Sequence, residues 1–232
     1  FESLLVEQLA RAEKMKSAGP CKDFKNMDTI TIGICLGDGI GPIIAQEAKK
    51  VLEFLISDEI ISGKIIIKEI EGLTIENRMA LNVSVPQDTL AQIKACDVIL
   101  KGPTTTPKGG TMESANVTLR RELDLYANVR PVVVPSEGID WIFYRENTEG
   151  EYTLGSRGIE IPGELAMDFK VTTDLGTKRI ARAAFEYAKA NGKTSVSIIT
   201  KANIMKKTDG KFSKICNEVG AEYPGIKKED WY

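Results

Sequence analysis

The fold is decided by residues 29–42, which read TITIGICLGDGIGP. The apolar run at residues 29–35 predicts a buried strand, because a short apolar segment bounded by turn residues is typical of a strand covered on both faces. Glycines dominate the turn that follows, and Pro42 suits the first position of a helix, where its missing N–H would have no partner. Apolar residues then recur at the spacing of one helix face: Ile44, Ala48, Val51, Leu52 and Leu55.

This pattern of strand, turn and helix repeats along the chain. Further strands are predicted at residues 64–70, 97–100 and 195–200, separated by helical segments such as residues 86–95. Because parallel neighbouring strands need helical crossovers, the alternation indicates an α/β protein with a largely parallel sheet. A charged stretch at residues 227–232 stands where a further element would be expected.

The glycine-rich turn does not carry the dinucleotide-binding fingerprint of the Rossmann fold. That fingerprint, G-x-G-x-x-G, would begin at Gly37 and place its last glycine at position 42, which is Pro42. Without the fingerprint, a glycine-dense turn between a strand and a helix is most simply a tight connection.

The composition excludes several classes of protein. With 42% hydrophobic and 28% charged residues among 232, the chain has enough apolar material for a core. Lys plus Arg number 31 and Asp plus Glu number 33, so the net charge of −2 gives no overall field that would draw the chain to nucleic acid or to an acidic membrane. We predict neither a membrane helix nor a secretory signal, because no run of about 18 apolar residues is present and no basic segment followed by an apolar core opens the sequence.

The residue types that are missing also limit the chemistry. The sequence has no histidine, which excludes Ser-His-Asp and Cys-His nucleophile systems and every histidine-containing metal site. Catalysis would therefore need Lys, Tyr, Arg, carboxylates or a cofactor. The four cysteines form no CxxC pair, and we interpret them as buried thiols of a reducing compartment: Cys21, Cys35, Cys96 and Cys216.

Several segments carry residues suited to binding an anion. Ser114 and Asn116 stand at a predicted helix N-terminus, where free N–H groups and the helix dipole favour negative charge. Arg120 lies one helical turn beyond Asn116 and therefore on the same face. Two further arginines belong to other elements. Arg130 is extended because it precedes a proline, and Arg145 stands at the end of a predicted strand. Converging arginines would suit a ligand with several carboxylates, although three solvated surface arginines fit the same spacing.

Two further residues are candidates for proton transfer. Lys201 ends the strand predicted at residues 195–200, and open α/β sheets bind their ligands at the C-terminal ends of parallel strands. Tyr152 ends a short loop of acidic and small residues. From position alone, each residue could equally have a structural role.

Six segments together resemble the β-decarboxylating dehydrogenases, and most closely the isocitrate dehydrogenase family. They occur in the family's order across residues 30–226: GDGIGP at 37–42, KGPTTTP at 101–107, SANVTLR at 114–120, LDLYANVRP at 123–131, RENTEGEY at 145–152 and KANIMK at 201–206. Two departures are modest, since Thr104 replaces a common leucine and residues 155–169 form a shorter segment than in many members. Six motifs in order are far more specific than any one of them.

The resemblance assigns roles in substrate binding. It implies that three arginines hold the substrate carboxylates: Arg120, Arg130 and Arg145. Ser114 and Asn116 would contact the γ-carboxylate that distinguishes isocitrate from related substrates. The family's isopropylmalate enzymes have apolar residues in that segment.

The resemblance also assigns the remaining site residues. Thr105 and Asn203 would lie near the nicotinamide of the cofactor. Lys201 would take part in removing the hydroxyl proton, and Tyr152 would protonate the enolate carbon. In family dimers the residues that match Lys201 and Asn203 reach into the partner's site, so a homodimer with shared active sites is expected.

The fold implied by the resemblance is a three-layer α/β subunit with a large and a small domain, distinct from the Rossmann fold. We expect a leader helix and linker at residues 1–27, the N-terminal part of the large domain at 28–100 and the small, dimerisation domain region at 101–232. The rest of the large domain, with the aspartates that bind Mg²⁺ or Mn²⁺, would follow residue 232. Phe1 in place of Met indicates that the start of the gene product is missing.

The expected activity is metal-dependent oxidative decarboxylation of isocitrate to 2-oxoglutarate with reduction of NAD or NADP, with a weak preference for NAD. One alternative is a dehydrogenase for homoisocitrate or another malate-type acid, against which Ser114 and Asn116 argue. A second is a non-catalytic regulatory subunit of a heteromeric isocitrate dehydrogenase, although the full set of Arg, Tyr and Lys residues is present. The expected location is cytoplasmic, with the mitochondrial matrix as the alternative if a transit peptide was removed.

Overall fold

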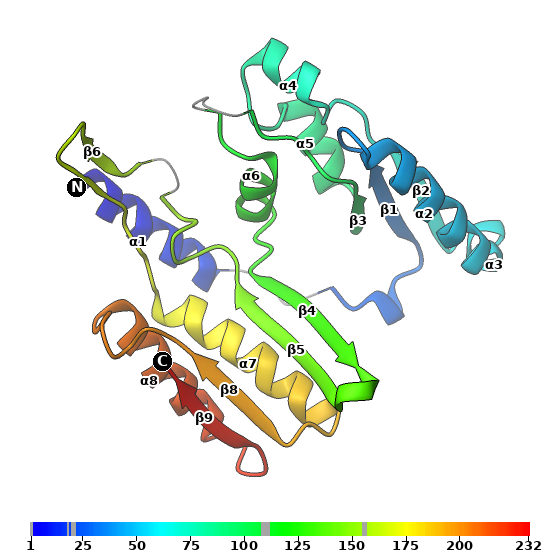
Figure 1. The fold of residues 1–232 in the computed structure, drawn as a ribbon. Helices are drawn as coiled ribbons and strands as arrows, with labels where there is room; N and C mark the ends of the chain where they lie inside the picture. The colour runs from blue at the N-terminus through cyan, green and yellow to red at the C-terminus, as the bar shows by residue number, and fades with distance from the viewer. Residues whose placement is uncertain (1, 18, 20–21, 108–111, 155–156) are drawn as a thin grey trace. The chain divides into compact units, whose positions relative to one another are not determined.

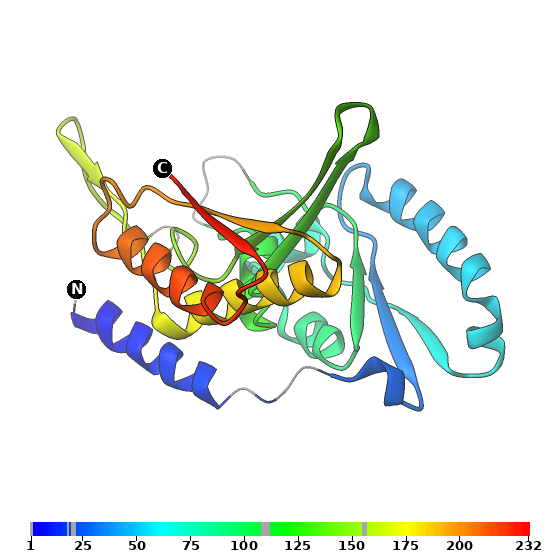
Figure 2. The same ribbon diagram turned by 90° about the horizontal axis from the view of Figure 1, so that it is seen from below.

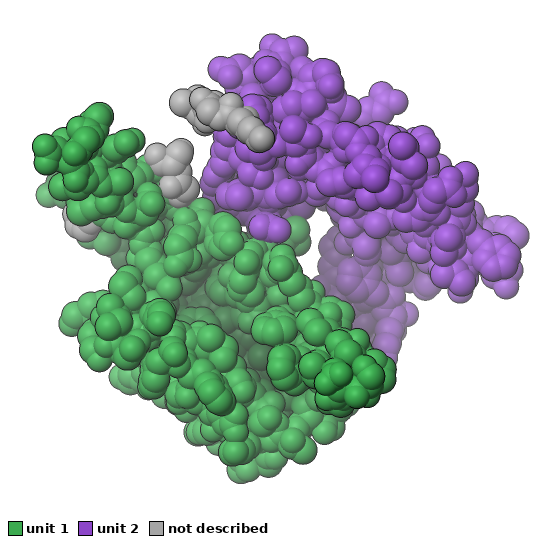
Figure 3. All heavy atoms as spheres, in the orientation of Figure 1, with its two compact units in different colours: residues 1–19, 124–232 green, residues 20–123 purple. Residues whose placement is uncertain are grey.

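The structure of the protein is a computed structural model that describes residues 2–17, 19, 22–107, 112–154 and 157–232 (Figures 1 and 2). The chain divides into two compact units, coloured separately in Figure 3. Unit 1 comprises residues 1–19 and 124–232, and unit 2 comprises residues 20–123. The predicted leader helix thus belongs to the same unit as residues 124–232, and the assignment of residues 28–100 and 101–232 to a large and a small domain stays a prediction.

Unit 2 is built on a parallel sheet with the strand order β2-β1-β3. Its strands are β1 (Ile30–Cys35), β2 (Ile65–Glu69) and β3 (Val98–Lys101). Ile32 of the central strand pairs with Ile67 on one side and Val98 on the other. The helical elements of this unit are η1 (Phe24–Asn26), α2 (Gly41–Leu55), α3 (Ser57–Ile61), α4 (Ile75–Leu81), α5 (Gln87–Lys94) and α6 (Ala115–Glu122). The sheet confirms the parallel α/β pattern that the sequence predicts.

The glycine-rich turn after β1 packs tightly against the loop after β3. Gly37 has φ +79°, and a Cβ atom on it would lie 2.1 Å from the Pro103 carbonyl oxygen. A Cβ atom on Gly102 would likewise lie 2.0 Å from the Leu36 carbonyl oxygen. Only glycine permits this approach of two backbones. The turn is therefore a tight connection, as the absence of a Rossmann fingerprint indicates.

Unit 1 combines helices with two-stranded sheets. Its helical elements are α1 (Glu2–Lys16), η2 (Pro135–Glu137), α7 (Asp174–Ala190) and α8 (Thr208–Gly220). Strands β4 (Ala127–Val134) and β5 (Ile139–Glu146) form an antiparallel ribbon that packs on α7 (Figure 1). Strands β6 (Ile159–Ile161) and β7 (Leu165–Met167) form an exposed hairpin. Strand β8 (Ser195–Ile199) pairs in parallel with β9 (Lys227–Trp231), which occupies the charged stretch where a further element was expected.

The core of unit 1 lies between α7, α8 and the β8–β9 pair. Phe185 is 1% exposed and stacks on Tyr223, with 5.2 Å between ring centroids. Ile198 of β8 and Ile215 of α8 are buried in the same cluster. Helix α7 thus has an apolar side against α8, and its first turn remains available for polar contacts.

The sequence pattern misses several short elements. Helix α4 has 7 residues, and β6 and β7 have 3 residues each, too few for a hydrophobic period to show. Strand β4 contains Pro131, which is tolerated because β4 pairs with a single strand. The prediction of a largely parallel sheet is therefore wrong for β4–β5 and β6–β7, whose short connections suit antiparallel hairpins.

The cysteines agree with the interpretation of buried thiols where the structure describes them. Cys35, Cys96 and Cys216 are free and buried, whereas Cys21 lies outside the described residues. Burial raises the pKa of Cys216 to about 12 and that of Cys35 to about 11. Across the described ranges, no helix has both the length and the apolar character needed to cross a membrane.

Candidate functional site

The β4–β5 ribbon places two of the predicted arginines on one face. Asn128 of β4 pairs with Arg145 of β5, and Arg130 follows two residues after Asn128. Alternate residues of a strand, and residues directly opposite across a ribbon, share a face. Arg130 also donates a hydrogen bond from Nε to Asn128 Oδ1 at 3.0 Å. Both guanidinium groups therefore leave the same side of the ribbon.

Arg145 also lies beside the candidate proton donor Tyr152. Its Cζ atom is 5.0 Å from the centre of the Tyr152 ring, a distance typical of a cation–π contact. Arg145 Nη2 donates to Asn147 Oδ1 at 3.2 Å, and Asn147 in turn donates to the Leu125 carbonyl oxygen at 3.3 Å. The structure thus brings together two residues that the sequence analysis selected on separate grounds.

Within the described residues, Arg130 and Arg145 have no acidic partner: their hydrogen bonds go to the amides of Asn128 and Asn147. An arginine without a carboxylate retains N–H donors for a ligand, and its planar fork can hold a ligand carboxylate bidentately. This face of the ribbon is therefore suited to a dicarboxylate or tricarboxylate.

Buried carboxylates hold the loop between β5 and Tyr152 in place. Glu146 accepts hydrogen bonds from the backbone N–H groups of Asn147 and Thr148 at 3.0 and 2.8 Å. Burial raises the pKa of Glu146, although the hydrogen bonds from Thr148 and the charge of Arg179 oppose the rise. Arg179 of α7 is itself held by a bidentate pair with Asp124, at 2.7 and 3.0 Å.

The second buried carboxylate is that of Glu149, whose side chain is 4% exposed. It accepts the backbone N–H of Thr173 at 2.8 Å, and Thr173 is the N-cap of α7. The positive end of the helix dipole stabilises a carboxylate at this position. Gly176 provides the space, because a Cβ atom there would lie 2.3 Å from Glu149 Oε1. Arg11 of α1 completes the site with Nη2 at 2.8 Å from the same oxygen.

Lys201 follows β8, and its backbone is also fixed by a carboxylate. Its N–H donates to Oδ1 of Asp209 at 2.8 Å, and Asp209 is 6% exposed. Lys170 Nζ lies 2.8 Å from Asp209 and 3.3 Å from Glu151. Glu151 precedes Tyr152, so Lys170 connects the two candidate catalytic segments of unit 1. The Lys201 side chain is exposed and has no ion-pair partner in the described part of the chain.

The remaining substrate-binding candidates belong to unit 2. Ser114 is the N-cap residue of α6, and its side chain makes no capping hydrogen bond. Asn116 accepts a hydrogen bond from the Thr104 hydroxyl at 3.3 Å. Arg120 lies further along the same helix. Burial lowers the pKa of Lys101, and the positive charge of Arg120 lowers it further, so a bound anion would stabilise the ammonium form.

Thr105 is held through its backbone. Its N–H donates to Asp38 Oδ2 at 2.8 Å, and its carbonyl oxygen accepts from Arg78 Nη2 at 2.5 Å. Asp38 also accepts the N–H of Ile75 at 2.6 Å. Arg78 is fully buried, and neither Nε nor Nη1 has a hydrogen-bond partner among the described residues. The loop around Thr105 is thus fixed from within unit 2.

The predicted site residues therefore form two groups. Unit 1 holds Arg130, Arg145 and Tyr152 together, with Lys201 linked through Lys170. Unit 2 holds a second set: Thr105, Ser114, Asn116 and Arg120. The convergence of the two groups on one substrate stays a prediction.

Sequence reasoning missed the residues that hold these segments in place. Arg11, Lys170 and Arg78 contact residues that are distant in sequence, and no local pattern marks them. Asp209 had a detectable signal, since Thr208 and Asp209 precede an apolar period, as is typical of a helix N-terminus.

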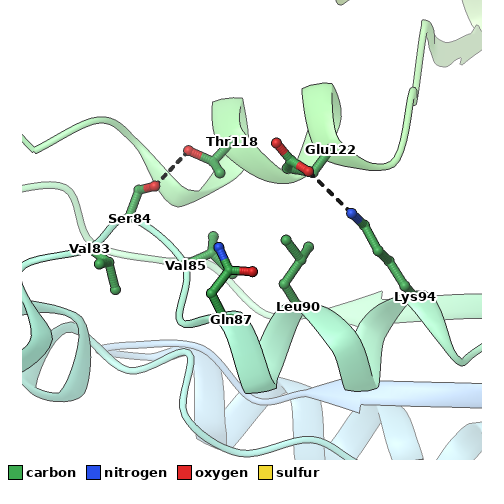
Figure 4. Close-up of a pocket in the computed structure, with 8 residues that line it drawn as sticks. All are labelled: Val83, Ser84, Val85, Gln87, Leu90, Lys94, Thr118 and Glu122. Carbon is green, nitrogen blue, oxygen red and sulfur yellow. Dashed lines mark hydrogen bonds and ion pairs between the residues drawn. The ribbon is translucent and has the colours of Figure 1, made fainter.

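A shallow depression in unit 2 is a poor alternative site. Its volume is 370 Å³, and it is lined by Val83, Ser84, Val85, Gln87, Leu90, Lys94, Thr118 and Glu122 (Figure 4). Most of its polar groups pair with each other, since the Thr118 hydroxyl bonds to Ser84 at 2.8 Å and Lys94 pairs with Glu122 at 3.2 Å. None of the predicted site residues lines it.

The described residues differ in how well they suit a metal and a nicotinamide cofactor. Among them, no group of three or more Asp, Glu, Cys or His side chains is placed to hold a metal ion. Thr105 and Asn203 suit a nicotinamide better, because their exposed side chains make no hydrogen bond within the described ranges and could donate to its carboxamide.

Comparison with known proteins agrees with the six motifs. The family described as Isocitrate/isopropylmalate dehydrogenase matches residues 31–232. The chain is 40% identical over 214 residues to the mitochondrial isocitrate dehydrogenase (NAD) catalytic subunit 6 of Arabidopsis thaliana, covering 89% of this chain and 54% of the relative. It is 38% identical over 213 residues to the chloroplastic 3-isopropylmalate dehydrogenase of Solanum tuberosum, covering 88% and 57%.

A third relative is named as regulatory rather than catalytic. It is a mitochondrial isocitrate dehydrogenase (NAD) regulatory subunit of Dictyostelium discoideum, 38% identical over 200 residues, covering 84% of this chain and 52% of the relative. The crystal structure of isocitrate dehydrogenase from Methylococcus capsulatus matches with a TM-score of 0.76 and 35% identity, over 88% of this chain and 60% of that one. The chain spans about half the length of the curated relatives it matches.

The space at Gly176 provides a test of the Glu149 site. Gly176→Ala should destabilise the protein by about 1–3 kcal/mol, because the new methyl group would displace a carboxylate that Arg11 and the start of α7 hold. Gly210→Ala is the matched control, since Gly210 is also the third residue of its helix and a Cβ atom there meets nothing within 4 Å. The free energy of unfolding of that control should rise by about 0.5–1 kcal/mol. Equal shifts in urea unfolding for the two variants would contradict the close contact.

The pH dependence of stability tests the Asp209 contacts. Burial raises the pKa of Asp209, but the hydrogen bonds from Lys170 and from the Lys201 N–H outweigh it and leave the pKa lowered. A lowered folded-state pKa adds stability above the unfolded value of about 3.9, and this stability is lost as the pH falls through the folded value. Asp209→Asn should therefore cost about 1–3 kcal/mol at pH 7, a difference that shrinks below about pH 4.

The control for this experiment is Glu160→Gln, at an exposed position on β6 whose side chain makes no hydrogen bond in the described residues. Urea unfolding of wild type and both variants between pH 3 and pH 7 would measure the effect. A cost of Asp209→Asn that did not change with pH would contradict the assigned charge pairing.

Proposed function

The chain belongs to the isocitrate/isopropylmalate dehydrogenase family, and we propose that it carries the carboxylate-binding and proton-transfer residues of an NAD-dependent isocitrate dehydrogenase. Its α/β fold is that of the isocitrate dehydrogenase-type enzymes, as the motifs predict. The observation that carries the proposal is the face of the β4–β5 ribbon. There Arg130 and Arg145 have no acidic partners among the described residues, and Arg145 lies 5.0 Å from the ring of Tyr152.

Substrate binding in this proposal is electrostatic and geometric. Two guanidinium groups on one face would each hold a carboxylate, which orients the bond that will break towards Tyr152. Arg120 of unit 2 would hold a further carboxylate. Ser114 and Asn116 would contact the γ-carboxylate, and the hydroxyl of Ser114, which makes no capping hydrogen bond at the start of α6, supports this role.

The proposed reaction oxidises the substrate hydroxyl to a ketone and then releases carbon dioxide. NAD, when bound, supplies the hydride acceptor. Lys201, in its uncharged amine form, would take the hydroxyl proton as the hydride leaves, and its side chain is accessible for this role. After carbon dioxide departs, the Tyr152 phenol gives one proton to the enolate carbon. The divalent metal expected of the family would be held by residues beyond this chain, and we assign it no step.

Two other substrates and one non-catalytic role compete with this proposal. The 38% identity to a 3-isopropylmalate dehydrogenase makes 3-isopropylmalate one competing substrate. Homoisocitrate, or another malate-type acid, is the other. The polar pair Ser114 and Asn116 supports isocitrate over a substrate that has an apolar group in place of the γ-carboxylate. The similarity to a regulatory subunit supports an activating role without catalysis, which the presence of Tyr152 and Lys201 disfavours.

Partners and compartment also belong to the proposal. We expect a homodimer, and relatives named as catalytic and regulatory subunits make a heteromer the alternative. The NAD-dependent relatives are named mitochondrial, which supports the mitochondrial matrix over the cytoplasm as the location. Nothing in the net charge favours nucleic acid as a partner.

A substrate panel on the full-length protein tests the function. Isocitrate, homoisocitrate and 3-isopropylmalate would each be supplied with NAD or NADP and Mg²⁺ or Mn²⁺, with reduced cofactor as the readout. We expect kcat/KM for isocitrate to exceed that for 3-isopropylmalate by about 100-fold or more, because a site built for a carboxylate binds an apolar group poorly. A preference for either other acid would refute the isocitrate assignment. Activation of a partner chain without turnover would identify a regulatory role.

Substitutions at Tyr152 and Lys201 should separate the two proton transfers. Tyr152→Phe keeps the ring and removes the phenolic proton, so hydride transfer should persist while protonation of the enolate slows. Lys201→Met removes the amine and keeps similar bulk, so oxidation itself should fail. General acid–base contributions are roughly 10²–10⁴-fold, which single-turnover measurements of reduced cofactor and of 2-oxoglutarate formation can resolve. Equal slowing of hydride transfer in both variants would show that the roles are not divided in this way.

A further inference from the structure

Helix α1 precedes the residues that match the family and is nevertheless docked on unit 1. The family match begins at residue 31, whereas α1 spans Glu2–Lys16. Leu5, Val6 and Leu9 are between 52% and 65% exposed, whereas Leu4 and Met15 are half-buried on the opposite side of the helix. Gln8, by contrast, is 8% exposed. The docked face therefore carries polar side chains beside apolar ones, and on it Gln8 and Arg11 lie one turn apart.

Arg11 is the centre of that face. Its Nη2 lies 2.8 Å from Glu149 Oε1, its Nη1 donates to the Thr148 carbonyl oxygen at 3.4 Å, and its Nε donates to Gln8 at 3.1 Å. The side chains of Arg11 and Glu149 are 19% and 4% exposed, so water and salt screen this pair little. A second link, between Glu7 and Arg157, has side chains 53% and 42% exposed and contributes less.

The residues that Arg11 holds lead directly to Tyr152. The Tyr152 N–H donates to the Glu149 carbonyl oxygen at 3.4 Å, and the intervening Gly150 bridges to Val171 in both directions, at 2.8 and 3.1 Å. Thr153 returns a hydrogen bond from its hydroxyl to the Thr148 carbonyl oxygen at 3.2 Å. Hydrogen bonds within the turn therefore fix the two groups that Arg11 contacts, the Thr148 carbonyl oxygen and the Glu149 carboxylate, relative to Tyr152. A shift of the Glu149 side chain would be passed to the Tyr152 ring and to the contact of that ring with Arg145.

We propose that Arg11 is a positioning residue for Tyr152, so that the N-terminal helix sets the geometry of the proton donor from outside the family-matching part of the chain. The role in catalysis rests on the proposed function; the mechanical link between Arg11 and the loop does not. An error of about 1 Å in the placement of a reacting group can cost about 100-fold in rate. Loss of the Arg11 charge should therefore affect turnover as well as stability.

The experiment compares Arg11→Gln with Lys16→Gln in the full-length protein. Both remove one positive charge from α1, but Lys16 has Glu13 of the same helix as its one ion-pair partner among the described residues, and both of those side chains are more than 60% exposed. With isocitrate and NAD, Arg11→Gln should lower kcat by about 10- to 100-fold with little change in KM, and Lys16→Gln should leave both unchanged. Equal effects of the two substitutions would overturn the proposal.

A double-mutant cycle separates positioning from a general loss of stability. If Arg11 acts through Tyr152, then Arg11→Gln in a Tyr152→Phe background should lower the rate of 2-oxoglutarate formation less than threefold, because the proton donor is already gone. A purely structural role would lower the rate by the same factor in both backgrounds, and that result would overturn the proposal.

Amide hydrogen exchange tests the link without any substrate. Arg11→Gln should increase exchange in residues 148–153 by tenfold or more and leave β8 (Ser195–Ile199) protected, which also shows that the variant folds. Arg11→Lys, which keeps a positive charge opposite Glu149, should exchange more slowly than Arg11→Gln. Unchanged exchange in residues 148–153, or equal exchange of the two variants, would overturn the link. Increased exchange in a protein that does not turn over isocitrate would instead refute the proposed function.

Discussion

The buried carboxylate of Glu149 is the contact on which the arrangement of unit 1 depends. A charge that is 4% exposed is costly unless it is paired and hydrogen-bonded, so the surrounding elements must supply partners together. Arg11 comes from α1, 138 residues away, and Thr173 comes from the start of α7, 24 residues away. Gly176 leaves the space that the carboxylate fills. Helices α1 and α7 are thus fixed to each other and to the loop that ends at Tyr152.

Unit 2 uses the same device around Asp38, which is 7% exposed. Its carboxylate accepts the N–H groups of Ile75 and Thr105, and its own N–H donates to the Pro103 carbonyl oxygen at 2.7 Å. Because Gly37 has no Cβ atom, the two loops can approach to hydrogen-bond distance. The motifs at residues 37–42 and 101–107 are therefore partners in one structure, and the acidic residue of the first fixes the backbone of the second.

The sequence predicts the elements whose signals are local, and it misses the contacts that are not. Strand β1, the start of α2 at Pro42 and the long helices α7 and α8 follow from apolar period and turn chemistry, because those forces act within a few residues. The candidate arginines and Tyr152 were accessible through family resemblance. Arg11 was not, because the only sign of its role is a carboxylate that approaches it after folding. Short elements such as α4 cannot be predicted in this way, because tertiary packing and not local propensity stabilises them.

The charges of unit 1 are divided in a way that supports a binding role over a structural one. Its buried carboxylates, Glu149 and Asp209 among them, are paired with cations from other elements, so they are satisfied without a ligand. Arg130, Arg145 and Lys201, which the motifs mark, have no carboxylate partner in the described residues. An arginine kept for structure would gain most from such a partner, whereas one kept for a substrate must leave its fork free. In the proposed function, a substrate with several carboxylates would supply the missing negative charge, so a chain of net charge −2 could still present a local anion site.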